Sequence, residues 1–212
     1  MIKKVAIQGI QGSFHDIVSK NYFLDAIETL PFLTFNEVVG SLTKHDSDAA
    51  IMALENSIAG SIIPNYALID NNDLHITGEY YLDVQHNLMA LSGQNITDIK
   101  EVHSHPMALL QCKVFFSQYP HIKLVEDSDT AGVAQRIHNQ QLKGVAAIAS
   151  VAAAEIYQLK ILAKSIQTIK HNETRFVIVE RTQNLSAKAN KASLKFMLDH
   201  KRGSLAAMLN VM

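Results

Sequence analysis

The residues with the clearest capacity for chemistry lie in one short segment near the end of the chain. The segment Asn172-Glu173-Thr174-Arg175-Phe176 runs directly into the apolar residues 177–179. A hydroxyl, a guanidinium and an aromatic ring beside a β-branched run predict a strand end, where open α/β folds bind their ligands. Taken alone the segment is a weak signal, because Thr and Phe both suit strands and an Arg at a strand end is usually a solvated charge.

Similar polar groups follow several other predicted strands. They are Asn56 and Ser57, Ser104, Ser128 to Thr130, and Ser150. In an open α/β fold such ends converge on one crevice and offer hydroxyls, amides and helix N-terminal N–H groups to an anion. We therefore expect a small acid as the ligand. Each residue has an alternative role as a helix N-cap, which we prefer for Ser13 and rate equally for Ser150.

The elements that must position these groups alternate along the chain. Apolar runs are followed by segments of helical period, which predicts an α/β protein with parallel strands. We expect strands at residues 5–7, 49–54, 101–104, 123–125, 144–149 and 174–179. Helices are expected to begin near Ser13, Pro106, Asp129 and Ser150. Residues 74–91 read as extended chain that carries the backbone from one lobe into another.

Composition excludes several classes of function. The 212 residues are 48% hydrophobic and carry a net charge of −1, so no basic surface is expected for nucleic acid or an acidic membrane. No apolar stretch approaches the roughly 20 residues that span a bilayer, and the N-terminus has no export-signal pattern. The single cysteine, Cys112, cannot form an internal disulfide. We expect a cytoplasmic protein of one or two domains.

Three patterns that would indicate a cofactor or metal are incomplete. The Gly9-x-x-Gly12 turn lacks the third glycine of a dinucleotide-binding fingerprint. His103 and His105 share one face of a predicted strand but have no evident third metal ligand, so we expect a structural role. Cys112 is expected to be a small buried residue. We predict neither cofactor nor metal.

Taken together, these segments resemble the prephenate dehydratases, which convert prephenate to phenylpyruvate with loss of carbon dioxide and water. The resemblance covers about residues 4–182. It rests on six motifs in consecutive order, Gly9-x-x-Gly12-Ser13-Phe14, Leu54-Glu55-Asn56-Ser57-x-x-Gly60-Ser61-Ile62, Ser104-His105-Pro106 with Gln111, Asp129-Thr130-Ala131-Gly132, Ala147-Ile148-Ala149-Ser150, and Asn172-x-Thr174-Arg175-Phe176.

The resemblance implies a catalytic domain at residues 1–183 with a type II periplasmic-binding-protein-like fold. Two α/β lobes would enclose the active site in the cleft between them. By analogy, the first lobe uses about residues 1–80 plus 162–183, and the second uses about 84–160. The substrate would be prephenate, and a homodimer or homotetramer is implied. The reaction itself needs no redox cofactor or metal, because the ring becomes aromatic as it loses carbon dioxide and hydroxide.

The resemblance also implies roles for individual residues. The essential hydroxyl would be that of Thr174, and the catalytic set would also include Asn56, Ser104 and Gln111. The implied substrate-binding residues are Glu55, Ser57, Thr130, Ala131, Arg175 and Phe176. An aliphatic hydroxyl is a poor acid, so we expect Thr174 to hydrogen-bond the leaving hydroxyl while the proton arrives through a neighbour or water. Arg175 would either assist electrostatically or anchor the strand end by pairing with a carboxylate such as Glu173.

The C-terminal residues 190–212 form a separate segment. Ala192, Leu194, Phe196 and Leu198 alternate as in a half-buried strand, and an apolar helical face follows Gly203-Ser204. The resemblance implies that these are the first strand and helix of a regulatory ACT domain, a ferredoxin-like α+β module, present here only in part. Such a tail must pack elsewhere, pair with another chain or stay disordered. We do not expect phenylalanine to act on these residues as an allosteric effector.

Two other functions stay open. One is arogenate dehydratase, which acts on the relative of prephenate that carries an amino group in place of the keto group. The other is a non-catalytic small-acid binding protein, because the same two-lobed fold serves solute capture. The Thr-Arg-Phe segment and the missing export signal count against the binding protein.

Overall fold

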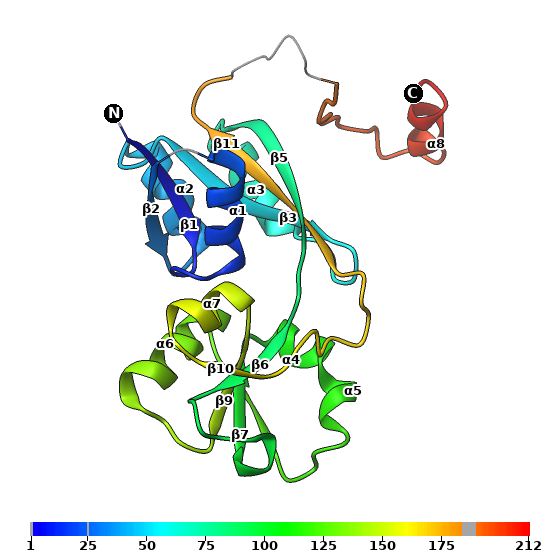
Figure 1. The fold of residues 1–212 in the computed structure, drawn as a ribbon. Coiled ribbons are helices and arrows are strands. Elements are labelled where there is room, and N and C mark those ends of the chain that lie inside the picture. Colours follow the sequence, from blue (N-terminus) through cyan, green and yellow to red (C-terminus); the bar gives the residue numbers. More distant parts are fainter. Residues whose placement is uncertain (1, 25, 184–189) are drawn as a thin grey trace.

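Two α/β lobes and a C-terminal tail make up the structure, a computed structural model that describes residues 2–24, 26–183 and 190–212 (Figure 1). The first lobe is built on a sheet of order β2-β1-β3-β11-β5, with β4 paired to β3. Its strands are β1 (Lys3–Gln8), β2 (Ile27–Phe32), β3 (Ala49–Asn56), β4 (Gly60–Ser61), β5 (His75–Asp83) and β11 (Glu173–Glu180). Its helices are α1 (Phe14–Phe23), α2 (Phe35–Thr43) and α3 (Ile63–Asn71).

The second lobe has its own sheet, of order β10-β6-β9-β7-β8. Its strands are β6 (Asn87–Ala90), β7 (Glu101–Ser104), β8 (Lys123–Glu126), β9 (Val145–Ala149) and β10 (Lys160–Ala163). Its helices are α4 (Pro106–Gln111), α5 (Lys113–Phe116), α6 (Thr130–Gln140), α7 (Val151–Ile156) and the 3₁₀ turn η1 (Ile96–Asp98). Strand β10 pairs with β6, so the second sheet extends to residue 163, beyond the expected end near 160.

Each sheet is covered on both faces, which explains the near-continuous apolar strands. In the first lobe, one core cluster contains Val18 of α1, and the other contains Leu42 of α2 and Ile69 of α3. In the second lobe, α4 and α5 cover one face and α6 and α7 the other. The predicted α/β class is confirmed. None of the described helices is both long enough and apolar enough to cross a membrane.

The expected parallel strands are present in both sheets, but each sheet also contains antiparallel pairs. Strands β1, β2 and β3 are parallel, but β11 runs antiparallel to both β3 and β5. In the second sheet β6 is antiparallel to β9 and β10. The reason lies in the connections between the lobes: β5 leaves the first lobe and β11 returns to it, so these neighbours must run in opposite directions (Figure 1).

Two crossing segments, residues 84–86 and 164–172, join the lobes and are hydrogen-bonded to each other. The backbone N–H of Val84 donates to the carbonyl of Asn172 over 2.7 Å, and the N–H of Ile166 donates to the carbonyl of His86 over 2.8 Å. The backbone N–H of His86 also donates to Oε1 of Gln167 over 3.0 Å. The connection between lobes is therefore a paired ribbon rather than two independent linkers.

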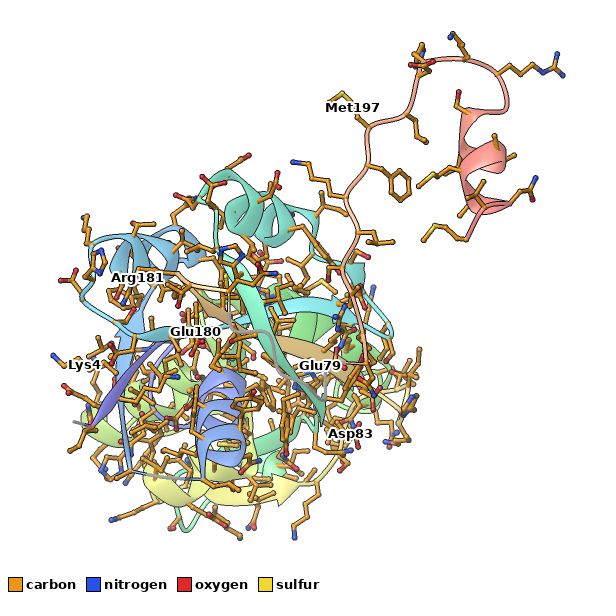
Figure 2. All side chains as sticks on the ribbon, turned by 90° about the horizontal axis from the view of Figure 1, so that it is seen from above. Lys4, Glu79, Asp83, Glu180, Arg181 and Met197 are labelled. Atoms are coloured by element: carbon orange, nitrogen blue, oxygen red, sulfur yellow. The ribbon has the colours of Figure 1, made fainter. Side chains whose placement is uncertain are left out.

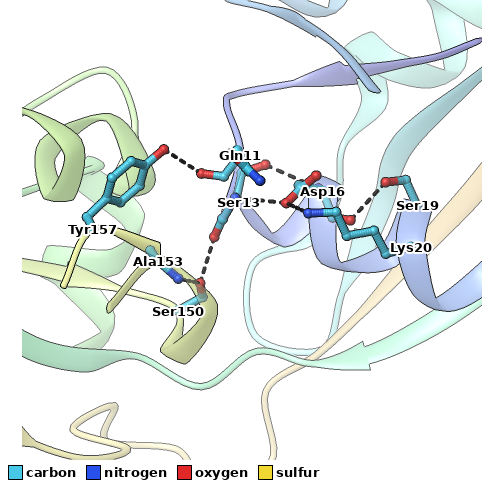
Figure 3. A network of polar contacts seen from close by, with 9 residues as sticks. Gln11, Ser13, Asp16, Ser19, Lys20, Ser150, Ala153 and Tyr157 are labelled. Carbon is cyan, nitrogen blue, oxygen red and sulfur yellow. Dashed lines mark hydrogen bonds and ion pairs between the residues drawn. The ribbon is translucent and has the colours of Figure 1, made fainter. Parts of the chain in front are cut away.

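A second contact between the lobes is made by the turn before α1 (Figure 3). The Ser150 hydroxyl caps α7 by accepting from the N–H of Ala153 and donates to the carbonyl of Gly12 over 2.6 Å. The Tyr157 hydroxyl donates to the carbonyl of Gln11 over 2.8 Å. Ser150 thus caps a helix and also bonds the other lobe.

The same turn starts α1. The Ser13 hydroxyl accepts from the N–H of Asp16 over 3.2 Å, which confirms the predicted N-cap. The buried Asp16 carboxylate accepts from the N–H of Gly12 and from Nζ of Lys20, both over 2.8 Å. The turn is therefore held rigidly against the helix that follows it.

The C-terminal tail differs from its prediction. Residues 190–199 form no strand, whereas α8 (Ser204–Leu209) matches the expected helix. A lone strand has no partner for its backbone groups, so alternation in the sequence is not enough to form one. Instead Lys191 pairs with Glu79 and lies over the ring of Tyr81, and Lys195 pairs with Asp70. Beyond these contacts Met197 is 97% exposed (Figure 2).

Gly12 allows the lobes to approach closely, and its replacement provides a test of that contact. Gly12 has φ of +86°, and an added Cβ would lie 2.9 Å from Cα of Ala153. Gly93 has φ of +88° with no atom within 4 Å of an added Cβ, so it is a matched control for backbone strain. We expect Gly93→Ala to cost about 1–2 kcal/mol of unfolding free energy. Gly12→Ala should cost about 2 kcal/mol more in urea unfolding, because it overpacks the contact. Equal losses would contradict this.

The buried His15 predicts a specific dependence of stability on pH. Its ring lies between Phe35 and Phe176, with centroids 5.4 and 5.0 Å away, and burial lowers its pKa to about 4. Between pH 6.5 and 4 the unfolded chain binds a proton that the folded protein excludes, so the unfolding free energy falls as the pH drops. From pH 7 to pH 5 the loss due to His15 is about 2 kcal/mol.

The measurement is urea unfolding of the wild type and His15→Phe at both pH values. We expect the variant to lose about 2 kcal/mol less than the wild type on acidification, since phenylalanine keeps the aromatic packing but binds no proton. His121→Phe replaces an exposed histidine and is the control. A pH dependence in His15→Phe identical to that of the wild type would show that His15 does not titrate as described.

Candidate functional site

Thr174 and Asn56 face each other across two neighbouring strands. Thr174 of β11 pairs in register with Asn56 of β3, and Nδ2 of Asn56 donates to Oγ1 of Thr174 over 2.8 Å. Thr174 is 7% exposed. The hydroxyl is therefore almost inaccessible to solvent. It lies at the end of the first sheet where β11 follows the second crossing.

A β-bulge puts the two side chains on the same face. Phe176 pairs with Ala53 and Arg175 pairs with Glu55, so Leu54 is an extra residue in β3. A bulge shifts the alternation of side chains between the two faces of a sheet. Without this extra residue the alternation would point Asn56 away from Thr174. The pairing of hydroxyl and amide thus depends on one irregularity in the strand.

Backbone groups fix the orientation of the Asn56 amide. Its Oδ1 accepts from the N–H groups of Ile58 and Ala59 over 3.0 and 2.8 Å. Because those partners can only donate, Nδ2 must be the atom that faces Thr174. The Thr174 oxygen is then an acceptor in this bond, and no hydrogen bond within the described residues uses its own hydrogen.

The amide contacts continue into the second lobe. Nδ2 of Asn56 also donates to Oδ1 of Asn172 over 2.8 Å. Nδ2 of Asn172 donates in turn to Oε1 of Gln111 over 3.0 Å and to the carbonyl of Val84 over 3.2 Å. We call Thr174, Asn56, Asn172 and Gln111 the amide chain. Gln111 ends α4, so the amide chain runs from the first lobe through the second crossing into the second lobe.

The orientation of Gln111 follows from its partners. Its Oε1 accepts from Asn172 and lies 2.8 Å from Nε2 of His86. Within the described residues, no hydrogen bond uses the amide nitrogen of Gln111. The site therefore offers two free donors, the Thr174 hydroxyl and the Gln111 amide, and both are neutral.

Ser57 and Ser104 have structural contacts in this structure. The Ser57 hydroxyl accepts from the N–H of Glu173 over 3.0 Å and so holds the start of β11. Ser104 is fully buried and donates to the carbonyl of Ile148 over 2.8 Å, which joins β7 to β9. The Ser104 hydroxyl is not part of the amide chain, and its catalytic role stays a prediction.

Thr130 and Ala131 begin α6, whose N-terminus is already capped. The Asp129 carboxylate accepts from the N–H of Gly132 over 2.7 Å. Burial raises the pKa of this carboxyl group, although the N–H groups of Gly132, Thr130 and Ala131 lower it. Ala131 itself is fully buried in the second-lobe core. This helix end thus carries its own carboxylate, and a role of both residues in substrate binding stays a prediction.

Glu55 and Arg175 lie on the opposite face of the first sheet from Thr174. Nε of Arg175 donates to Glu79 over 2.9 Å, and its Nη1 lies 3.5 Å from Glu55. Arg175 therefore pairs with carboxylates, as one of its two expected roles requires, but its partners are Glu79 and Glu55 rather than the example Glu173. Tyr66 donates to Glu55, and burial together with this bond raises the pKa of Tyr66 to about 12.

Phe176 belongs to the core rather than to an exposed surface. It is 2% exposed and packs edge-on against His15. Of the residues expected to form the site, the structure brings together Thr174, Asn56 and Gln111. Glu55 and Arg175 form a separate ion-pair cluster with Glu79.

The histidines and the cysteine that could suggest a metal have other partners. Nε2 of His103 lies 2.9 Å from Glu101, and Nδ1 of His105 accepts from the N–H of Met107 over 3.2 Å. Cys112 is buried, and burial raises its pKa to about 12. No group of three or more His, Cys, Asp or Glu residues suited to a metal occurs among the described residues.

Two residues of the site, Asn172 and His86, were given no role from the sequence. Asn172 stands in the recognised segment, but its central position between Asn56 and Gln111 depends on the crossing. His86 follows β5 in the first crossing, where a single histidine in extended chain carries no pattern of its own. Only the folded connection between the lobes brings His86 to Gln111.

Comparison with known proteins places this site in a family. Residues 5–184 match the family described as prephenate dehydratase. Arogenate dehydratase 2 of Petunia hybrida is 38% identical over 98% of this chain and 53% of that protein. The bifunctional chorismate mutase/prephenate dehydratase of Buchnera aphidicola subsp. Schizaphis graminum is 31% identical over 96% of this chain and 54% of that protein.

A solved prephenate dehydratase from Staphylococcus aureus subsp. aureus Mu50 is 28% identical, with a TM-score of 0.74 over 98% of this chain and 78% of that chain. The present chain spans about half the length of the curated relatives it matches. The family match covers both lobes and every residue of the amide chain. The resemblance inferred from the six motifs is confirmed, and the chain belongs to the prephenate dehydratase family.

Proposed function

We propose that the chain catalyses the decarboxylating dehydration of prephenate to phenylpyruvate, carbon dioxide and water, a step in phenylalanine biosynthesis. The observation that carries the proposal is the orientation of the Thr174 hydroxyl. It accepts from Asn56, and its own hydrogen is used by no bond in the part of the chain that the structure describes, within an amide chain that reaches both lobes. Membership of the prephenate dehydratase family supports the same reaction.

The reaction matches a site made of neutral donors. The bond to the ring carboxylate breaks and its electrons enter the ring, while the carbon–oxygen bond to the ring hydroxyl breaks and the ring becomes aromatic. The departing hydroxide takes up one proton to form water. The enzyme must therefore bind a dianion and stabilise negative charge on the leaving oxygen, which hydrogen-bond donors in a water-poor site do well.

Thr174 is placed in this proposal at the leaving hydroxyl. A threonine hydroxyl is too weak an acid to supply the proton alone, so it donates a hydrogen bond while the proton arrives through water or a neighbouring group. The N–H of Asn56 that Thr174 accepts polarises the hydroxyl and strengthens it as a donor. Asn56 acts through Thr174 in this scheme.

Gln111 is assigned to substrate binding. Its free amide N–H groups suit a carboxylate oxygen, and its position on α4 brings that donor from the second lobe. Arg175 is already paired with Glu79 and Glu55 and serves in this proposal to anchor the strand end. A neutral amide attracts the charged carboxylates of the substrate less strongly than an arginine side chain would.

Arogenate is a second candidate substrate, because the Petunia relative is named an arogenate dehydratase. Purified protein incubated with prephenate and, separately, with arogenate decides between them by formation of phenylpyruvate or phenylalanine. Binding of prephenate without any product would instead support a small-acid binding protein. Cytoplasmic location, a homodimer or homotetramer, and the absence of a phenylalanine effect stay predictions.

Replacement of Thr174 tests the assigned hydroxyl. We expect Thr174→Ala to lower kcat by about two to four orders of magnitude, the effect of losing a positioned proton-transfer group, while Thr174→Ser retains much of the activity. Thr77→Ala is the control, since Thr77 lies on the neighbouring strand β5 and its hydroxyl faces the carbonyl of Ile178 over 3.5 Å. Activity of Thr174→Ala within a few-fold of the wild type would remove Thr174 from the mechanism.

A further inference from the structure

His86 is a buried histidine that the mechanism above does not use. It lies in the first crossing, with its backbone bonded on both sides to the second crossing through Gln167 and Ile166. Its Nε2 atom lies 2.8 Å from Oε1 of Gln111, and its ring is T-shaped with the Phe14 ring, the two centroids lying 5.9 Å apart. The backbone and the ring are therefore both fixed.

The contacts of Gln111 determine which nitrogen of His86 carries the hydrogen. The carbonyl of Val84 can only accept, so the Asn172 atom that faces it is the donor Nδ2. That same Nδ2 donates to Gln111, and the Gln111 atom it meets is Oε1. Oε1 can only accept, so Nε2 of His86 must carry a hydrogen.

The surroundings of His86 favour its neutral form. Burial is the main cause that lowers its pKa, and the nearby His105 acts in the same direction, against the bond to Gln111. Its Nδ1 atom is buried without a hydrogen-bond partner among the described residues. A neutral ring with its hydrogen on Nε2 satisfies Gln111 and leaves on Nδ1 only a lone pair.

The geometry points to His86 as a positioning residue: its Nε2–H holds Oε1 of Gln111, so that the Gln111 amide nitrogen faces the bound acid. The inference rests on the proposed function and names how its substrate-binding donor is oriented. An amide can turn over and exchange its oxygen and nitrogen. A turned amide would present oxygen to a carboxylate and would repel it. Two fixed donors on the same oxygen, His86 and Asn172, oppose that turn.

A pair of His86 variants tests the role. His86→Leu removes the donor, whereas His86→Gln retains an N–H near the position of Nε2. We expect His86→Leu to raise KM for prephenate about tenfold with kcat within about threefold, as for the loss of one hydrogen bond that orients a binding group. His86→Gln should recover most of this loss. The exposed His121→Leu is the control.

A merely structural role gives a different result. Partial unfolding lowers the active fraction, and with it the apparent kcat, but leaves KM unchanged. A fall in kcat alone, or equal kinetic losses in His86→Leu and His86→Gln, would overturn the inference.

A double-mutant cycle with Gln111→Leu tests the pathway of the effect. If His86 acts through Gln111, then His86→Leu has no further effect on KM in the Gln111→Leu background. A KM of the double variant that is raised by the product of the two single increases would overturn the inference. Nitrogen NMR of the wild type should also find the hydrogen of His86 on Nε2, and a hydrogen on Nδ1 alone would overturn it as well.

Failure of the proposed function is distinguishable from failure of this inference. If the wild type forms no product, the dissociation constant of prephenate measured by calorimetry replaces KM, with the same expected tenfold weakening in His86→Leu. Product formation by the wild type with an unchanged KM in His86→Leu would overturn the role of His86 alone. A wild type that neither converts nor binds prephenate would overturn both.

Discussion

The antiparallel pairing of β11 with β3, shifted by one extra residue in β3, is the constraint on which the site depends. It brings together residues 118 positions apart in the chain and turns both side chains to the same face. A threonine and an asparagine in regular strands would share a face only by a coincidence of register. The bulge at Leu54 aligns Asn56 with Thr174, while the residues of β3 before the bulge remain in the two core clusters of the first lobe.

The same pairing places the ion pairs of Arg175 and the contact between Thr174 and Asn56 on opposite faces of the first sheet. Thr174 and Asn56 look towards the side covered by α1, whereas Arg175 and Glu55 lie on the side of α3 with Glu79 and Tyr66. The ion pairs hold the end of β11 from the face opposite Thr174. In the proposed mechanism the side chains that contact the substrate, Thr174 and Gln111, are neutral donors, so binding of its two carboxylates would depend on their orientation.

Much of this arrangement could be predicted from the sequence, and the reasons for the exceptions are physical. Asn56 and Thr174 could be predicted because each is a polar residue at the end of an apolar run, and such strand ends are visible in the local sequence. Ser104 and Ser57 carry the same local pattern, yet their hydroxyls bond backbone. The bulge, the pairing partner of Arg175 and the position of His86 depend on contacts between distant segments, which no local pattern encodes. The alternation at residues 192–198 indicated a strand, but residues 190–199 pair with no strand among the described residues.

The paired ribbon between the lobes has a consequence for motion. Asn172 is at once a residue of the ribbon and the central member of the amide chain, and His86 bonds both the ribbon and Gln111. A swing of one lobe about this ribbon would pull Gln111 away from Asn172 and release its amide. Access for a ligand and alignment of the donors are therefore mechanically coupled. A molecule whose lobes have swung apart also has its Gln111 donor out of position.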